Sequence, residues 1–220
     1  MPERGRLAPE GLPFVIGGVA LTLLAAVFTS PWMTVICALL AAFIIWFFRD
    51  PARRIPGDDG LVVSPADGKV VEVAPGISDP GLPDDGYTRV AIFLSVFNVH
   101  VNRAPVAGTV ERVDYTAGRF LNAMKSEASG ENERNRISLV SSETEPRELI
   151  PFTQIAGLIA RRIVCYKKAG DQVRRGERVG LIRFGSRTEI LIPPGYGIVV
   201  KPGETVKGGS SIIARREPAP

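Results

Sequence analysis

The stretch of residues 11–48 constrains this chain most, because it contains no charged side chain. It divides into two apolar runs, 12–28 and 32–48, with a short Thr-Ser-Pro turn between them. Each run has 17 residues and is just long enough to span a bilayer as a helix. Because Pro31 disfavours one continuous helix, the simplest arrangement is a hairpin of two transmembrane helices. Residues 1–50 are therefore predicted to form a membrane anchor.

A cleavable secretory signal is the alternative interpretation of this stretch. Such a signal has an apolar core of about 7–15 residues, followed by a small-residue cleavage site. Here the apolar stretch is longer and runs directly into charged sequence, which favours the anchor. The basic residues on the two sides of the stretch predict a cell-membrane protein with both termini on the cytoplasmic side. They are Arg4, Arg6, Arg49, Arg53 and Arg54.

Charge and cysteine content exclude several classes of function. The net charge of +4 is small and dispersed, so nucleic-acid binding is not expected. Basic residues near the membrane would instead attract anionic lipid head groups, by about 1 kcal/mol each. Cys37 lies in an apolar run and Cys165 in the remainder, so no disulfide is expected between them. The chain has one histidine and no metal-binding motif, and no metal is predicted.

From residue 51 onward the sequence predicts a mostly β domain, 51–220. Short β-branched runs alternate with Gly, Pro and Asp, a pattern typical of a sandwich or barrel. The expected strands are 60–64, 69–73, 89–101, 108–115, 136–141, 155–166, 178–184, 188–192, 197–201 and 211–215. Segments 65–70, 105–110 and 170–176 resemble the hammerhead barrel of biotinyl and lipoyl carriers, so a hammerhead or barrel-sandwich-like fold is predicted. Two irregular stretches, 78–86 and 117–135, are expected to be surface loops.

The Gly185-Ser186 pair has the strongest chemical potential, because it stands at the start of an apolar strand. A serine after a flexible glycine can attack the preceding carbonyl, and the resulting ester can break by elimination. The second chain would then begin with a ketone. A second pair, Gly209-Ser210, would release a fragment too short to stay securely in a sheet. Ser186 is therefore the better candidate.

His100 is the candidate base for this serine. In the run 91–103 alternate residues share a face, and one face ends in three polar residues, Asn98, His100 and Asn102. Asp67, in an Asp-Gly turn, is a candidate to orient the imidazole, as a carboxylate does in serine hydrolase triads. A surface histidine and a plain turn are the alternatives for these two residues.

Four segments in this order, after an apolar hairpin, resemble the short, archaeal-type proenzymes of the phosphatidylserine decarboxylase family. They are Ser-Pro-Ala-Asp-Gly at 64–68, Phe-Asn-Val-His-Val-Asn-Arg at 97–103, Glu-Asn-Glu-Arg-Asn at 131–135 and Arg-Phe-Gly-Ser-Arg at 183–187. The resemblance implies self-cleavage into a β chain, 1–185, and an α chain, 186–220, which begins with a pyruvoyl group derived from Ser186. It implies a carboxy-lyase that converts phosphatidylserine to phosphatidylethanolamine through a Schiff base on that group, as part of phospholipid biosynthesis. Membrane lipids are then the partners, and a homo-oligomer is compatible with the sequence.

The resemblance also suggests head-group contacts. Long members of the family carry a second histidine where this chain has Arg103, which cannot act as a base but can bind a carboxylate or phosphate. Glu133 and Arg134 are further candidates, beside Asn98 and Asn102. Two alternatives remain: an archaetidylserine decarboxylase acting on ether lipids, and a non-enzymatic hammerhead adaptor that would stay a single chain.

Overall fold

The computed structural model describes residues 6–79, 81–83, 85–124, 128–158, 162–183 and 185–217. The chain forms two compact units, Met1–Ala52 and Arg53–Pro220. The boundary lies two residues after the predicted end of the membrane anchor.

The first unit is an antiparallel helix pair. A short 3-10 turn, Pro9–Gly11, leads into α1 (Leu12–Phe28), and α2 (Pro31–Phe47) follows after two residues. Pro31 begins α2, where its missing N–H costs no hydrogen bond. Strands β1 (Arg6–Leu7) and β2 (Arg49–Asp50) pair with each other beyond the open end of the helix pair. The predicted apolar helix pair is confirmed, with boundaries within one residue of those expected.

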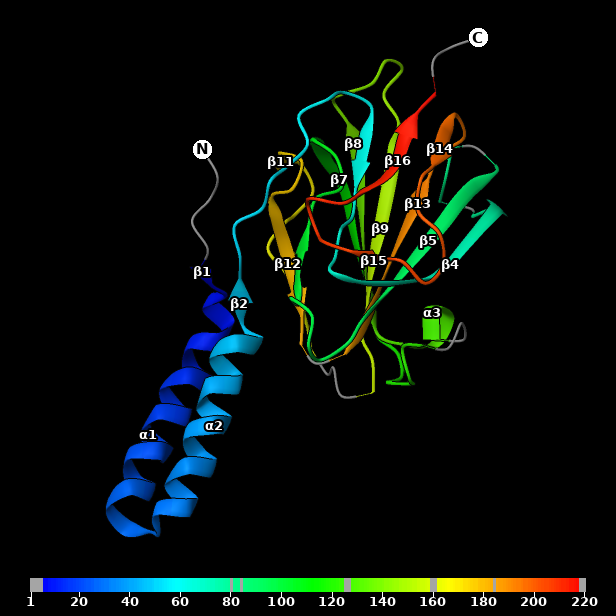
Figure 1. The fold of residues 1–220 in the computed structure, drawn as a ribbon. Coiled ribbons are helices and arrows are strands. Elements are labelled where there is room, and N and C mark those ends of the chain that lie inside the picture. Colours follow the sequence, from blue (N-terminus) through cyan, green and yellow to red (C-terminus); the bar gives the residue numbers. More distant parts are fainter. Residues whose placement is uncertain are drawn as a thin grey trace. The chain divides into compact units, whose positions relative to one another are not determined.

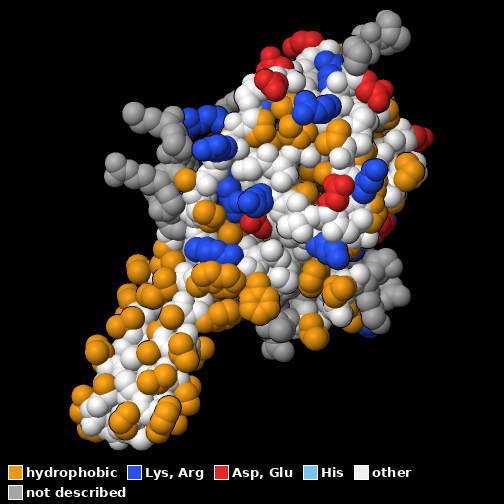
Figure 2. All heavy atoms as spheres, in the orientation of Figure 1, with side chains coloured by type: hydrophobic (Ala, Val, Ile, Leu, Met, Phe, Trp, Pro, Cys, Tyr) orange, Lys and Arg blue, Asp and Glu red, His pale blue; other side chains and the backbone are white. Residues whose placement is uncertain are grey.

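The surface of this unit is almost entirely apolar (Figure 2). The helical segment Pro9–Phe28 is long and apolar enough to cross a membrane, whereas Pro31–Phe47 is shorter. Exposed apolar side chains recur along both helices. Such a surface is unfavourable in water and suits a lipid environment.

The second unit is built from three antiparallel sheets (Figure 1). The largest sheet curls into a half barrel, with the strand order β11 (Gln172–Val173), β7 (Gly108–Thr116), β8 (Arg134–Ser141), β9 (Leu149–Ile155), β13 (Ser186–Ile192), β5 (Tyr87–Leu94), β4 (Gly68–Ile77) and β15 (Thr205–Val206). A second sheet has the order β10 (Ile163–Cys165), β12 (Arg178–Ile182) and β6 (Val101–Arg103). A third has the order β14 (Tyr196–Ile198), β16 (Ile212–Arg216) and β3 (Leu61–Val63). The short helix α3 (Ala128–Glu131) lies in the stretch between β7 and β8.

Alternate residues of the central strands point to one face of the large sheet and build the core of the domain. Strand β13 pairs with β5 on one side and with β9 on the other, so it lies in the middle of the large sheet. Its residues Ile190 and Ile192 join Ile92 and Leu94 of β5 in one fully buried core. The predicted mostly β fold behind an apolar helix pair is confirmed.

Two of the predicted strands are wrong in their extent. The expected strand 89–101 ends at Leu94, because Asn98 closes a turn with Ser95 before β6 begins at Val101. The alternation assumed for 91–103 therefore does not hold across the turn. The expected strand 155–166 is wrong over most of its length: it begins where β9 ends, at Ile155, and only β10, from Ile163 to Cys165, lies within it, while most of β9 was not predicted. The residues 159–161 between β9 and β10 lie outside the described part of the chain.

Candidate active site

Ser186 occupies the first position of β13 and is fully buried. Within the described residues its hydroxyl oxygen has no hydrogen-bond partner. Gly185, directly before it, has a φ of +65°, a left-handed conformation that glycine adopts without strain. An unpaired buried hydroxyl costs about 1–3 kcal/mol. The Ser186 side chain is therefore held in the interior without a hydrogen bond to its hydroxyl from any described residue.

His100 reaches the same peptide from the segment before β6. Its side chain is 2% exposed, and its Nδ1 lies 2.9 Å from the carbonyl oxygen of Asn98. Because a carbonyl oxygen can only accept, Nδ1 is assigned the proton. The backbone N–H of Gly185 then donates to an unprotonated Nε2 at 3.3 Å. The imidazole thus presents a basic nitrogen at the Gly185-Ser186 segment, as expected for a general base.

Gly157, two residues after β9, packs against the carbonyl group of Gly185. A Cβ atom at residue 157 would lie 2.2 Å from the carbonyl oxygen of Gly185. No side chain fits at that distance without moving the backbone, so a glycine lets the two backbones approach. The carbonyl that Ser186 would attack is therefore fixed by backbone packing on one side.

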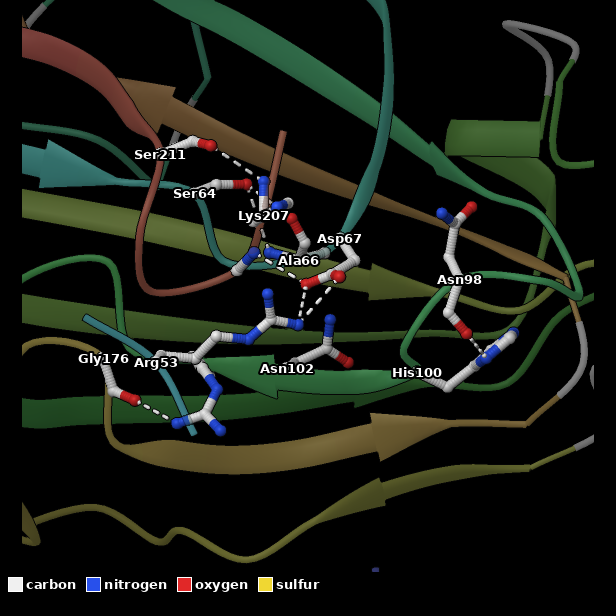
Figure 3. A network of polar contacts seen from close by, with 12 residues as sticks. Arg53, Ser64, Ala66, Asp67, Asn98, His100, Asn102, Gly176, Lys207 and Ser211 are labelled. Carbon is white, nitrogen blue, oxygen red and sulfur yellow. Dashed lines mark hydrogen bonds and ion pairs between the residues drawn. The ribbon is translucent and has the colours of Figure 1, made fainter. Parts of the chain in front are cut away.

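Asp67 does not face His100 (Figure 3). Both of its carboxylate oxygens accept hydrogen bonds from Arg53 at 2.8 Å, and one also accepts the backbone N–H of Gly208. The ion pair is buried, with side-chain exposures of 8% for Arg53 and 13% for Asp67. The group that orients the His100 ring in this structure is the Asn98 carbonyl, which Figure 3 shows beside the ring.

Of the two predicted amides, Asn98 supports the turn and Asn102 lies in the interior. The Asn98 side chain accepts hydrogen bonds from the backbone and hydroxyl of Ser95. Asn102 is fully buried, donates to the Thr188 hydroxyl at 3.2 Å and accepts from Gln154 at 2.9 Å. Thr188 is two residues after Ser186 on β13, so this polar network adjoins the serine on the same face of the strand.

The three charged residues predicted to contact the head group are Arg103, Glu133 and Arg134, and they lie in different surroundings. Arg103 is 4% exposed and donates to the Gly176 carbonyl at 2.8 Å. Arg134 begins β8 and donates to the Gly130 carbonyl, while Glu133 hydrogen bonds with Tyr115. The structure therefore brings His100, Gly185 and Ser186 together, with Asn102 close to them, and gives the charged residues partners within the chain.

Sequence reasoning missed an ionic cluster on the opposite face of β13. Arg187 is 1% exposed and binds Glu189 and Glu72, each at 2.6 Å. Glu72 also accepts a hydrogen bond from Arg89, and Glu189 accepts one from Ser129 of α3. Burial raises the pKa of Glu72, but its hydrogen bonds with the two arginines outweigh burial and hold the pKa below its ordinary value of 4.5. The cluster fixes the strand immediately after Ser186.

A second missed group holds the long loop before β8. The Asn132 side chain is fully buried, donates to the carbonyls of Leu121 and Ala156, and accepts the Leu121 N–H. The sequence signal that could have pointed to Asn132 was a polar residue in a loop too long for a hairpin turn. Asn132 thereby ties this loop to the segment that carries Gly157.

Comparisons with known proteins agree with this arrangement. The family model for phosphatidylserine decarboxylase matches residues 40–214. A relative from Solibacter usitatus, named phosphatidylserine decarboxylase proenzyme, is 46% identical over 211 residues, covering 96% of this chain and 97% of the relative. Relatives with the same name from Granulibacter bethesdensis and Nitratidesulfovibrio vulgaris are 46% and 47% identical, each over 96% of this chain and over 85% and 95% of their own lengths. The chain belongs to the phosphatidylserine decarboxylase family.

Proposed function

We propose that this chain is a phosphatidylserine decarboxylase proenzyme that cleaves itself between Gly185 and Ser186. One arrangement supports this proposal. The Ser186 hydroxyl is buried and has no hydrogen-bond partner within the described residues, Gly185 before it has a left-handed backbone, and the Gly185 N–H donates to the basic nitrogen of His100. A pyruvoyl group made from Ser186 fits these residues, because the hydroxyl directly follows the carbonyl that it must attack. The relatives named as proenzymes support the same reading.

Cleavage begins when the Ser186 oxygen adds to the Gly185 carbonyl carbon and its proton passes to His100. The peptide C–N bond breaks, the amine takes up a proton, and an ester joins the two residues. A base then removes the Cα proton of Ser186, and the ester C–O bond breaks to leave a carboxylate on Gly185. The dehydroalanine left at residue 186 takes up water and loses ammonia, which gives the pyruvoyl group. His100 is the proposed base for both proton transfers.

In decarboxylation, the pyruvoyl group supplies a carbonyl for the substrate amine and an electron sink for the loss of CO2. His100 is the proposed holder of the proton that replaces the carboxylate. The burial of His100 and Ser186 excludes bulk water, which strengthens charge interactions in the site. Asn102, hydrogen bonded to Thr188 and Gln154, keeps the wall beside residue 186 polar and rigid.

After cleavage, the proposed α chain, 186–220, has several attachments to the proposed β chain, 1–185. Strand β13 pairs with β5 and β9, and β16 pairs with β3. The Gly208 N–H donates to Asp67 at 2.8 Å. These contacts suit an enzyme whose new chain end must stay in place. We further propose that residues 1–50 anchor the enzyme in the cell membrane and that its catalytic domain faces the cytoplasm.

Intact-mass analysis of the purified protein tests the cleavage. The wild type is expected to give two chains that separate at Gly185-Ser186, and the smaller one should carry a ketone in place of its terminal amine. Ser186→Ala should give one chain. Ser210→Ala is the matched control, because Gly209 before it is also left-handed, with a φ of +74°, and cleavage should proceed normally. Normal processing of Ser186→Ala would exclude this site.

His100→Gln tests the proposed base. Since a general base contributes about 10²–10⁴-fold to a rate, the half-time of self-cleavage should lengthen by that factor. The measurement is the fraction of cleaved chain against time after synthesis, followed by gel or mass. Cleavage of this variant at the wild-type rate would remove His100 from the mechanism.

A further inference from the structure

Three large apolar side chains are exposed on separate loops of the β domain. Phe97 and Leu158 are each 65% exposed and Met124 is 59% exposed. Phe97 lies between β5 and β6, Met124 between β7 and β8, and Leu158 after β9. Exposed apolar side chains that gather at one place usually mark an interaction surface.

Two of these side chains are next to residues that pack at the scissile carbonyl. A Cβ atom at Gly157 would lie 2.2 Å from the Gly185 oxygen and 3.2 Å from the Cβ atom of Ala123. The loops that contain residues 123 and 157 therefore meet at Gly185. Met124 and Leu158, the next residues in the chain, project from this junction into solvent.

Phe97 is connected to the same peptide through its neighbour in the chain. The next residue, Asn98, contacts His100 through its carbonyl, and His100 accepts the Gly185 N–H. The turn after β5, the loop before α3 and the end of β9 lie at the same end of the domain (Figure 1). Phe97, Met124 and Leu158, which we call the apolar rim, thus lie on three loops that are distant in sequence and that contact Gly185 or its partner His100 through neighbouring residues.

The rim continues inward as an apolar surface. Phe120 and Ile163 are partly exposed and pack against the buried Ala156 and Ile182. Ser186 itself is fully buried, so a substrate reaches it only past surrounding chain, and these loops are the ones that contact Gly185. An entrance of this composition suits a molecule whose polar head is followed by hydrocarbon.

We propose that the apolar rim inserts into the lipid surface, so that the substrate's serine head group enters the site while its acyl chains stay in the bilayer. Its role in substrate entry rests on the proposed function. A lipid surface is the occupant we infer because the apolar helix pair of the same chain, proposed above as a membrane anchor, would keep the domain near a bilayer. Arg162 adds charge complementarity to anionic lipid: it is exposed, and its carbonyl accepts the N–H of Arg183, two residues before Gly185.

Fluorescence of the uncleaved full chain tests the insertion directly. In a Ser186→Ala protein with Trp32→Phe and Trp46→Phe, Phe97→Trp introduces a single reporter. In vesicles of brominated phosphatidylcholine and phosphatidylserine, its emission should be blue-shifted and quenched. Val199→Trp is the matched control, because Val199 is an exposed apolar residue, 46% exposed, on the segment after β14, and quenching should be absent. Unquenched emission from Phe97→Trp would overturn the proposal.

Kinetics test the role in substrate entry. The variant Phe97→Ser, Met124→Ser and Leu158→Ser should lower kcat/KM for long-chain phosphatidylserine in vesicles at least about tenfold, since burying even one such side chain contributes about 1.5–3 kcal/mol. Its kcat/KM for monomeric dihexanoyl-phosphatidylserine should stay near that of wild type, and Val199→Ser should match wild type on both substrates. An equal loss on both substrates, or no loss on vesicles, would contradict the proposed entry route. If Phe97→Trp is quenched but the wild type decarboxylates neither substrate, the insertion of the apolar rim into lipid is supported and the proposed function is refuted.

Discussion

The unpaired hydroxyl of Ser186 predicts that removing it stabilises the proenzyme. A buried hydroxyl without a partner costs about 1–3 kcal/mol, so Ser186→Ala should raise the free energy of unfolding by about that amount. Thr188, two residues along the same strand, is an internal comparison because its buried hydroxyl accepts a hydrogen bond from Asn102. Thr188→Val keeps the shape and leaves the amide short of a partner. The two deletions should therefore change stability in opposite directions.

The comparison needs uncleaved chain, so it uses the His100→Gln background, in which self-cleavage is expected to be slowed, and uncleaved protein is isolated before the measurement. In a domain of this size, 1 kcal/mol shifts Tm by about 2–4 °C. Relative to that background, Ser186→Ala should raise the Tm of the β domain by at least about 2 °C, and Thr188→Val should lower it by a similar amount or more. The assay is thermal unfolding of the detergent-solubilised protein, followed by circular dichroism at a strand wavelength.

One result would refute this reasoning. If Ser186→Ala lowers Tm as Thr188→Val does, the serine hydroxyl is hydrogen bonded in the folded proenzyme. It would then have to break that bond before attacking the preceding carbonyl. The site would lose the feature that distinguishes Ser186 from the other buried hydroxyl on its strand.

Two further predictions concern carboxylates outside the reacting peptide. Asp67→Asn breaks a buried ion pair with Arg53 and should lower the free energy of unfolding by about 3–5 kcal/mol, while the folded protein still cleaves itself. Arg53→Gln should lower Tm by a similar amount. If cleavage is slow in Asp67→Asn but not in Arg53→Gln, the result would instead support a role of Asp67 at His100. Glu72, whose pKa is lowered in the fold, contributes stability that is present above its ordinary pKa of 4.5 and lost as pH falls through the lower folded pKa. The Tm gap between wild type and Glu72→Gln should thus shrink as pH falls below the ordinary pKa of 4.5, whereas a constant gap would show that the ion pairs with Arg89 and Arg187 are not the cause.

Local sequence predicted the elements with short-range causes. The uncharged stretch 11–48 gives an apolar helix pair, because a helix satisfies its backbone hydrogen bonds within its own segment. Short β-branched runs between turn residues predicted a β domain, and the position of Ser186 at the start of a strand was correct. The break after Leu94 was missed because Asn98 stops the strand with a side-chain hydrogen bond that hydrophobic alternation does not reveal.

The sequence by itself determined the class of chemistry, since a Gly-Ser pair at a strand start with one histidine in the chain restricts the possible reactions. Only the tertiary structure decided which groups meet. His100 reaches Gly185 across 85 residues, and Asp67 pairs with Arg53 instead of the imidazole. Gly157 abuts the Gly185 carbonyl through a backbone contact that leaves no mark in composition or periodicity. Alternation along a strand fixes the face on which a side chain lies, but the partner across that face depends on strand order and register, which arise only when the whole sheet closes.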